Sequence, residues 1–191
     1  MAIKIFIDQG HNPTGYHNSG ATGNGLYEQD ITYLVGRYLY DLLTNDPRFE
    51  AKLSRPEETT VLGYNNASSL ADRVNSANSW NADYFISIHV NASENPAANG
   101  SEVYVYDENS ESYYLAQDIL NSIVSFVGTK NNGVRINKTF YVLRKTTMPA
   151  LLVELAYITN YEDSLKLAND TYLFAFSIYR GILKYLKLSS L

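Results

Sequence analysis

The stretch IKIFIDQGH, residues 3–11, decides how this chain folds. Its apolar run leads to His11, and the same arrangement returns in YFISIH, which ends at His89, and in ALLVE, which ends at Glu154. Parallel strands that are covered on both faces read as unbroken apolar runs. An ionisable side chain at the end of such a strand usually points into a site rather than into a core.

Strand and helix patterns alternate along the chain. The predicted strands cover residues 3–8, 49–54, 84–89, 101–106 and 148–155, and the stretch 133–144 reads as an irregular loop with a short strand. The predicted helices begin near residue 27 and end near 45, and then cover 68–80, 112–127, 161–168 and 172–186. This alternation predicts an α/β fold with a twisted, largely parallel sheet flanked by helices. The length of 191 residues suits one compact domain, and we expect a single domain over residues 1–191.

A long segment between the first strand and the first helix has no apolar period. Residues 10–26 are rich in Gly, Asn and Thr and must form a loop, and loops of this length in compact domains are commonly functional. Glu28 follows directly, in or near the first turn of the helix. The loop glycines let the chain fold back so that Glu28 can approach His11.

Composition excludes several classes of partner and site. A net charge of -5 and a pI near 5.2 argue against a nucleic-acid partner, because that affinity comes mainly from Lys and Arg. The chain has no cysteine, so any metal must be held by histidine and carboxylate. It has no apolar run of the roughly 20 residues that cross a bilayer, and its start lacks the pattern of a signal peptide. We therefore expect no membrane partner.

Two histidines and a glutamate are a recurrent ligand set of hydrolytic zinc sites, which keep a fourth position for water. His11 and His89 fit this set because they lie at equivalent strand ends, although a lone histidine after a strand is more often structural. Glu28 is the third candidate, and on local pattern alone it is explained equally well as a residue that favours a helix N-terminus. Glu154, at the end of an apolar run, suits a proton carrier because partial burial raises the pKa of a carboxylate.

Four further polar residues are expected to have roles other than metal binding. His17 belongs to the loop and is expected to be solvated or close to substrate, but not a ligand. Asn91 is expected to brace the loop after His89, and Arg73 to form a structural ion pair. Arg144 is a candidate contact for a substrate carboxylate. Motifs of serine hydrolases, phosphate loops, dinucleotide-binding folds and HExxH peptidases do not occur.

Several blocks of the sequence resemble the zinc-dependent N-acetylmuramoyl-L-alanine amidases of the amidase-3 type, which include bacterial autolysins and phage endolysins. The matching blocks are IFIDQGHNP, GLYEQD, ADRVNSANSWNADYFISIHVNAS, GSEVYVY and YVLRKTTMPALLVELAYITNYED, in the order of the family. The resemblance implies a catalytic amidase domain with a mixed sheet. It also implies zinc bound by His11, Glu28 and His89, with Glu154 as the catalytic carboxylate.

The substrate that the resemblance implies is bacterial peptidoglycan, at the amide between N-acetylmuramic acid and the first L-alanine of the stem peptide. Such an enzyme acts outside the cell, at the cell wall, and we expect it to be a monomer. Two alternatives use the same fold or ligands: a silent wall-binding or regulatory module, and a zinc peptidase or deacetylase. A silent module would be expected to lack a ligand or the catalytic carboxylate, and the sequence keeps all four residues.

Overall fold

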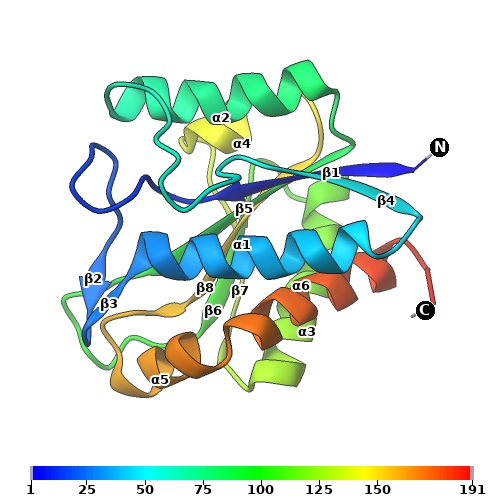
Figure 1. Cartoon of the computed structure of the whole chain (residues 1–191). Coiled ribbons are helices and arrows are strands. Elements are labelled where there is room, and N and C mark those ends of the chain that lie inside the picture. Colours follow the sequence, from blue (N-terminus) through cyan, green and yellow to red (C-terminus); the bar gives the residue numbers. More distant parts are fainter. Residues whose placement is uncertain (1, 190–191) are drawn as a thin grey trace.

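The computed structural model describes residues 2–189 and places six strands in one sheet, in the order β4-β1-β5-β8-β6-β7 (Figure 1). The strands are β1 (Ile3–Gln9), β4 (Phe49–Leu53), β5 (Tyr84–Asn91), β6 (Ser101–Val105), β7 (Asn131–Ile136) and β8 (Ala150–Tyr157). A small antiparallel pair, β2 (Thr22–Gly23) and β3 (Leu26–Tyr27), lies apart from this sheet. The predicted α/β class with a largely parallel sheet is confirmed.

The directions of the strands bring four strand ends together. Strands β4, β1, β5 and β8 run parallel, whereas β6 is antiparallel to β8 and β7 is parallel to β6. The carboxyl ends of β1, β5 and β8 therefore lie at the same edge of the sheet as the amino end of β6. This edge is where the ionisable residues of the sequence gather.

Helices cover both faces of the sheet (Figure 1). The helices are α1 (Glu28–Thr44), α2 (Asn66–Trp80), α3 (Glu111–Val127), α4 (Tyr141–Lys145), α5 (Tyr161–Asn169) and α6 (Thr171–Tyr185). The core on one face joins α1, α3 and α6 to the sheet, and a smaller core on the other face joins α2 and α4 to it. None of the helices within residues 2–189 is long and apolar enough to cross a membrane.

Strand β1 shows how one apolar run serves both cores. Ile5 and Ile7 are fully buried in the larger core, whereas Phe6, between them, belongs to the smaller core. Phe6 stacks there on Phe85, with ring centroids 5.6 Å apart. Because successive side chains of a strand point to opposite faces, a strand buried on both faces needs the continuous apolar sequence seen here.

Two predicted strands end two residues too early, at His89 instead of Asn91 and at Leu155 instead of Tyr157. Strand β5 continues past His89 to Asn91, and β8 continues past Glu154 to Tyr157, so both ionisable residues lie within strands. The continuation is possible because these side chains face a cavity while the residues after them, such as Leu155, return to the core. His11 alone follows the end of its strand.

The stretch 133–144 also differs from its prediction. Its first residues complete strand β7, but YVLRK forms the short helix α4 instead of a strand or loop. Val142 and Leu143 are buried against the sheet in the smaller core. Tertiary packing of these two side chains outweighs the strand preference of Tyr and Val in so short a segment.

A buried aspartate ties the turn after α1 to helix α6. Asp46 accepts hydrogen bonds from Nε of Arg48 at 2.7 Å and from the hydroxyl of Tyr179 at 2.8 Å. The hydrogen bonds from Arg48 are the main reason that the pKa of Asp46 is lowered to about 2. This carboxylate therefore remains ionised in the folded protein well below the pH at which an unfolded aspartate is protonated.

Replacing Asp46 with asparagine should make the fold less sensitive to acid. An unfolded aspartate has a pKa of about 3.9, so the ionised Asp46 stabilises the fold fully above that pH and progressively less as the pH falls toward 2. We expect Asp46→Asn to lower the free energy of unfolding at neutral pH by roughly 1–3 kcal/mol and to reduce its further loss in acid. Urea unfolding at several pH values measures both. Asp41→Asn is the control, because Asp41 forms only an exposed pair with Arg37 at 3.7 Å; equal effects of the two changes would contradict the prediction.

Candidate functional site

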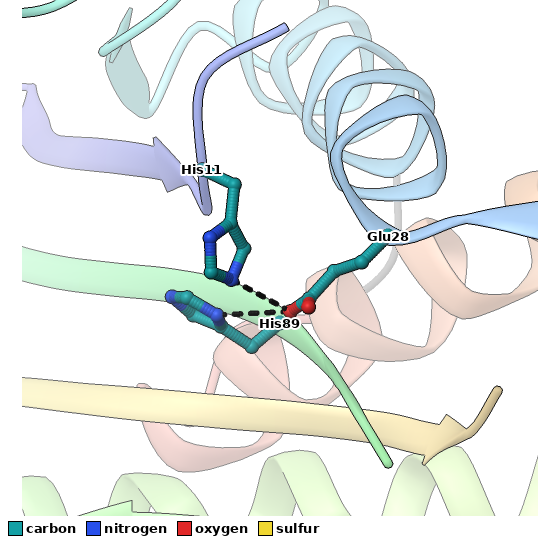
Figure 2. A group of neighbouring side chains, drawn as sticks. All are labelled: His11, Glu28 and His89. Atoms are coloured by element: carbon teal, nitrogen blue, oxygen red, sulfur yellow. Dashed lines mark hydrogen bonds and ion pairs between the residues drawn. The ribbon is translucent and has the colours of Figure 1, made fainter. Parts of the chain in front are cut away.

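Three of the predicted site residues converge at the carboxyl edge of the sheet (Figure 2). His11 comes from the turn after β1, Glu28 is the first residue of α1, and His89 lies in β5. Oε1 of Glu28 is 3.1 Å from Nε2 of His11 and 3.1 Å from Nδ1 of His89. The ligand atoms of all three lie within 4.8 Å of one another, which makes this group a candidate metal centre.

The dimensions and the donor set of this group fit zinc. Ligand atoms about 2.0–2.1 Å from a tetrahedral zinc ion lie about 3.3 Å apart, close to the observed separations. Nδ1 of His11 lies 3.2 Å from the carbonyl oxygen of Asn18, which can only accept a hydrogen bond. Nδ1 of His11 therefore carries a proton. Nε2 faces Glu28, to which it donates a hydrogen bond when it is also protonated, and without that proton it would be free to bind a metal.

Two glycines let the backbone pass close to these side chains. A Cβ atom at Gly10 would lie 2.6 Å from the carbonyl oxygen of Ile88 and 2.7 Å from a ring carbon of His89. A Cβ atom at Gly20 would lie 2.7 Å from Cβ of Glu28. The long loop therefore does fold back onto Glu28, and Gly20 is the loop glycine at that contact.

The backbone of His11 is held in an unusual conformation. His11 has a φ of 68°, a left-handed value that is uncommon for residues other than glycine. The guanidinium of Arg73 donates to the carbonyl oxygen of His11 at 2.6 Å and to that of Gln9 at 2.5 Å. The same guanidinium pairs with Asp8 at 2.6 Å, so the predicted structural ion pair of Arg73 is present. Burial would raise the pKa of Asp8, but Arg73 and the hydroxyl of Ser87 outweigh it and keep that pKa below its ordinary value.

Glu28 is buried, with 4% of its surface exposed, and its carboxylate has four partners. Besides the two histidines, Oε1 accepts a hydrogen bond from the backbone N–H of Val90 at 2.9 Å, and Oε2 accepts one from that of Ala21 at 2.8 Å. Burial acts to raise the pKa of Glu28, but the hydrogen bonds from His11 and His89 lower it far below its usual value. Glu28 is therefore ionised, as a metal ligand has to be.

Glu154 lies on the strand next to His89, and the two residues are paired in register across β5 and β8. Both line a cavity of about 280 Å³, together with His11 and an apolar wall that includes Phe140 and Leu152. Oε2 of Glu154 is buried and has no hydrogen-bond partner among residues 2–189. Burial, and then the negative charges of Glu28 and Glu102, raise the pKa of Glu154 well above its ordinary value.

The other polar residues of the sequence lie outside the metal-ligating group. His17 is half-buried, and its Nε2 lies 2.9 Å from the carbonyl oxygen of Leu62. Arg144 is exposed and lies over the ring of Tyr141, which lines the cavity. Asn91 donates to a carboxylate that sequence reasoning missed, Glu102, at 2.7 Å.

Comparison with known proteins places the chain in a family. A family model described as N-acetylmuramoyl-L-alanine amidase, Amidase_3, matches residues 5–184. The chain belongs to this amidase family. His11, Glu28, His89 and Glu154 all lie within the matched region.

Individual members of the family resemble the chain over nearly its whole length. The N-acetylmuramoyl-L-alanine amidase LytC of Bacillus subtilis (strain 168) is 39% identical over 173 residues, which are 88% of this chain and 32% of LytC. The amidase CwlM of Bacillus licheniformis is 38% identical over 181 residues, 94% of this chain and 65% of CwlM. The chain therefore spans less than two thirds of the length of either relative.

Solved structures of the family have the same fold. The crystal structure of the N-acetylmuramoyl-L-alanine amidase from Clostridium difficile 630 aligns with a TM-score of 0.86 and 31% identity, over 99% of each chain. The solved structure of the N-acetylmuramoyl-L-alanine amidase AmiC2 of Nostoc punctiforme aligns with a TM-score of 0.84 and 38% identity, over 97% of each chain.

Replacing Arg73 with methionine should destabilise the fold strongly. The change leaves the carboxylate of Asp8 buried without its cation, which typically costs about 3–5 kcal/mol. Combining Arg73→Met with Asp8→Asn should cost less than the sum of the two single changes, because neither charge then remains unpaired. Urea unfolding of the two single variants and the double variant measures the free energies of this double-mutant cycle. The control Arg37→Met removes an exposed pair and should cost under about 1 kcal/mol, and an equally small loss for Arg73→Met would contradict the prediction.

Proposed function

We propose that residues 1–191 form a catalytic domain that hydrolyses the amide between N-acetylmuramic acid and L-alanine in bacterial peptidoglycan. The domain acts at the cell wall as a monomer, with a zinc ion held by His11, Glu28 and His89. Glu154 serves as the catalytic carboxylate. The names of the family and of its members support the reaction, and the donor set of the three-residue group supports zinc.

One observation carries this proposal: a buried carboxylate oxygen without a partner lies in the same cavity as the three-residue group. Buried polar atoms are nearly always hydrogen-bonded, so an unpaired one needs an explanation. Oε2 of Glu154 is explained if it hydrogen-bonds a water or a substrate group during the reaction. Its place in the lining of the same cavity as His11 and His89 supports a role for this atom beside the metal centre.

The side chains divide the work of hydrolysis. When bound, zinc supplies a Lewis acid that polarises the scissile carbonyl and makes water a stronger acid. Glu154 accepts a proton from the attacking water and delivers it to the nitrogen of the leaving L-alanine, which breaks the C–N bond. The apolar wall of Phe140 and Leu152 limits water around Glu154 and keeps its proton affinity high.

The two alternatives have less support. A silent module has no use for an unpaired buried carboxylate, and Glu154 is present together with all three candidate ligands. A zinc peptidase or deacetylase would use the same residues, but the family match favours the muramoyl amide. Mass analysis of digested peptidoglycan distinguishes the three: the proposed amidase releases stem peptides with a free amino-terminal alanine.

Removal of the metal should abolish cleavage of a muramoyl-L-alanine substrate, and added zinc should restore it. We expect one zinc ion per chain by elemental analysis of the reconstituted protein. His89→Ala should lose most of this zinc, because it removes one of three ligands. His17→Ala is the matched control and should keep the zinc, because His17 lies outside the group. Full activity in metal-free protein would overturn the zinc mechanism.

Glu154→Gln and Glu28→Gln should separate the roles of the two carboxylates. Glu154→Gln should bind zinc normally and lose roughly 10²–10⁴-fold in kcat, because an amide cannot carry the proton. Glu28→Gln should lose zinc affinity, because a neutral amide is a poor ligand. Glu94→Gln makes the same change at an exposed position and should alter neither quantity. Loss of zinc in Glu154→Gln, with zinc and rate kept in Glu28→Gln, would reverse the assigned roles.

A further inference from the structure

In one segment of this acidic protein, all the charged residues are basic. Residues 119–153 contain no Asp or Glu and five of the 15 Lys and Arg residues, whereas the rest of the chain has ten basic and 20 acidic residues. The five are Lys130, Arg135, Lys138, Arg144 and Lys145. The segment continues from helix α3 through β7 and α4 into β8.

The basic segment forms one wall of the active-site cavity. Phe140, Tyr141 and Val142 line the cavity on the side of α4, and Leu152 lines it from β8. Asn18 and Leu70 of α2 also line the cavity. The cations of the segment do not line the cavity themselves, but Arg144 lies over the ring of Tyr141, which does. A cation next to this lining favours an anionic part of a substrate there.

Within this wall, Arg135 is held by a built network. Its Nε donates to Oε2 of Glu102 at 2.6 Å. Glu102 is only 4% exposed and is itself fixed, because its other oxygen accepts hydrogen bonds from Asn91 at 2.7 Å and from the hydroxyl of Tyr104 at 3.0 Å. Lys138, by contrast, pairs with the exposed Asp107. Arg135 is therefore the fixed cation of the wall.

The network lies directly beside Glu154. Glu102 and Glu154 are paired in register across β6 and β8, so their side chains lie on the same face of the sheet. Arg135 is on β7, the next strand, and reaches Glu102 from there. Strands β8 and β7 are separated by two spacings of about 4.8 Å, so the guanidinium lies within the span of about three residues of an extended peptide from Glu154.

The guanidinium of Arg135 has donors to spare. Glu102 occupies only Nε, no hydrogen bond from either Nη group is found within residues 2–189, and 52% of the side chain is exposed. These exposed N–H groups are open to a ligand. Two parallel N–H groups of a guanidinium match the two oxygens of a carboxylate.

We propose that Arg135 binds a carboxylate on the peptide part of the substrate, so that the peptide leaves Glu154 across β6 and β7. The proposal rests on the proposed amidase function. It assigns the acidic peptide to the basic wall and the uncharged sugar to the side of Asn18 and Leu70. Arg135 is a specificity residue, because it acts on substrate away from the reacting atoms.

The test compares two substrates in the zinc-loaded protein: N-acetylmuramoyl-L-alanyl-D-glutamate and its fully amidated analogue. The unaltered protein should prefer the acidic substrate through a lower KM. Arg135→Gln should raise the KM for the acidic substrate roughly 10- to 100-fold, with little change in kcat and none for the amidated substrate. A glutamine amide can still donate to Glu102, and thermal unfolding checks that the variant is folded. Arg135→Lys keeps the positive charge but lacks the two parallel N–H groups, and it should retain part of the preference.

Two matched variants and a binding measurement make the result decisive. Lys138→Gln removes one charge from the same segment and should leave the preference intact; Arg144→Gln tests the rival cation beside the cavity. An equal loss for both substrates in Arg135→Gln, or a selective loss in Arg144→Gln instead, overturns the proposal. Calorimetry with the peptide L-alanyl-D-glutamate and its amide measures binding to the subsite without cleavage. It therefore distinguishes failure of the proposed subsite from failure of the proposed amidase function. If neither substrate is cleaved, selective binding of the acidic peptide that is lost in Arg135→Gln still supports the subsite, and equal binding of the two peptides refutes it.

Discussion

The active edge of the sheet depends on the buried guanidinium of Arg73. Three hydrogen-bond acceptors lie at the end of strand β1: the carboxylate of Asp8 and the backbone carbonyl groups of Gln9 and His11. All three accept hydrogen bonds from Arg73. Unpaired, these acceptors would each cost free energy in a region without water. One guanidinium satisfies all three and at the same time holds the left-handed turn at His11. The position of the first histidine therefore follows from the core, not from the loop after it.

Two carboxylates next to His89, Glu28 and Glu154, are held in opposite states by their surroundings. Glu28 is surrounded by donors, two imidazoles and two backbone N–H groups, and these outweigh the effect of burial on its pKa. Glu154 is buried among apolar side chains with an oxygen that has no donor, so burial acts on it without compensation. The negative charge of Glu28 raises the pKa of Glu154 further. A pair of acids separated in this way suits one for binding a cation and the other for carrying a proton.

The sequence predicted the α/β class and most strands and helices, because apolar runs are local patterns. It also predicted that His11 and His89 lie close together, although it ended the strand of His89 two residues too early. It left Glu28 undecided, since a glutamate at a helix start has a sufficient local explanation. It also missed helix α4, because Tyr141 and Val142 favour a strand and the helix depends on the burial of Val142 and Leu143. Glu102 and Arg135 are 33 residues apart in the sequence, and no local pattern predicts that they pair.

The antiparallel direction of β6 is what gives the cavity its asymmetry. Had β6 run parallel to β8, its carboxyl end would lie at the active edge and Glu102, near its amino end, would lie at the far edge of the sheet. Because the strand is reversed, Glu102 stands beside Glu154, and the following strand β7, parallel to β6, carries Arg135 to the same face. A third acidic residue near Glu28 and Glu154 would by itself repel an acidic substrate. Because Arg135 is bound to it, Glu102 instead holds a cation on the side of Glu154 toward β6 and β7. This cation would attract the acidic part of a peptide and so orient the peptide across these two strands.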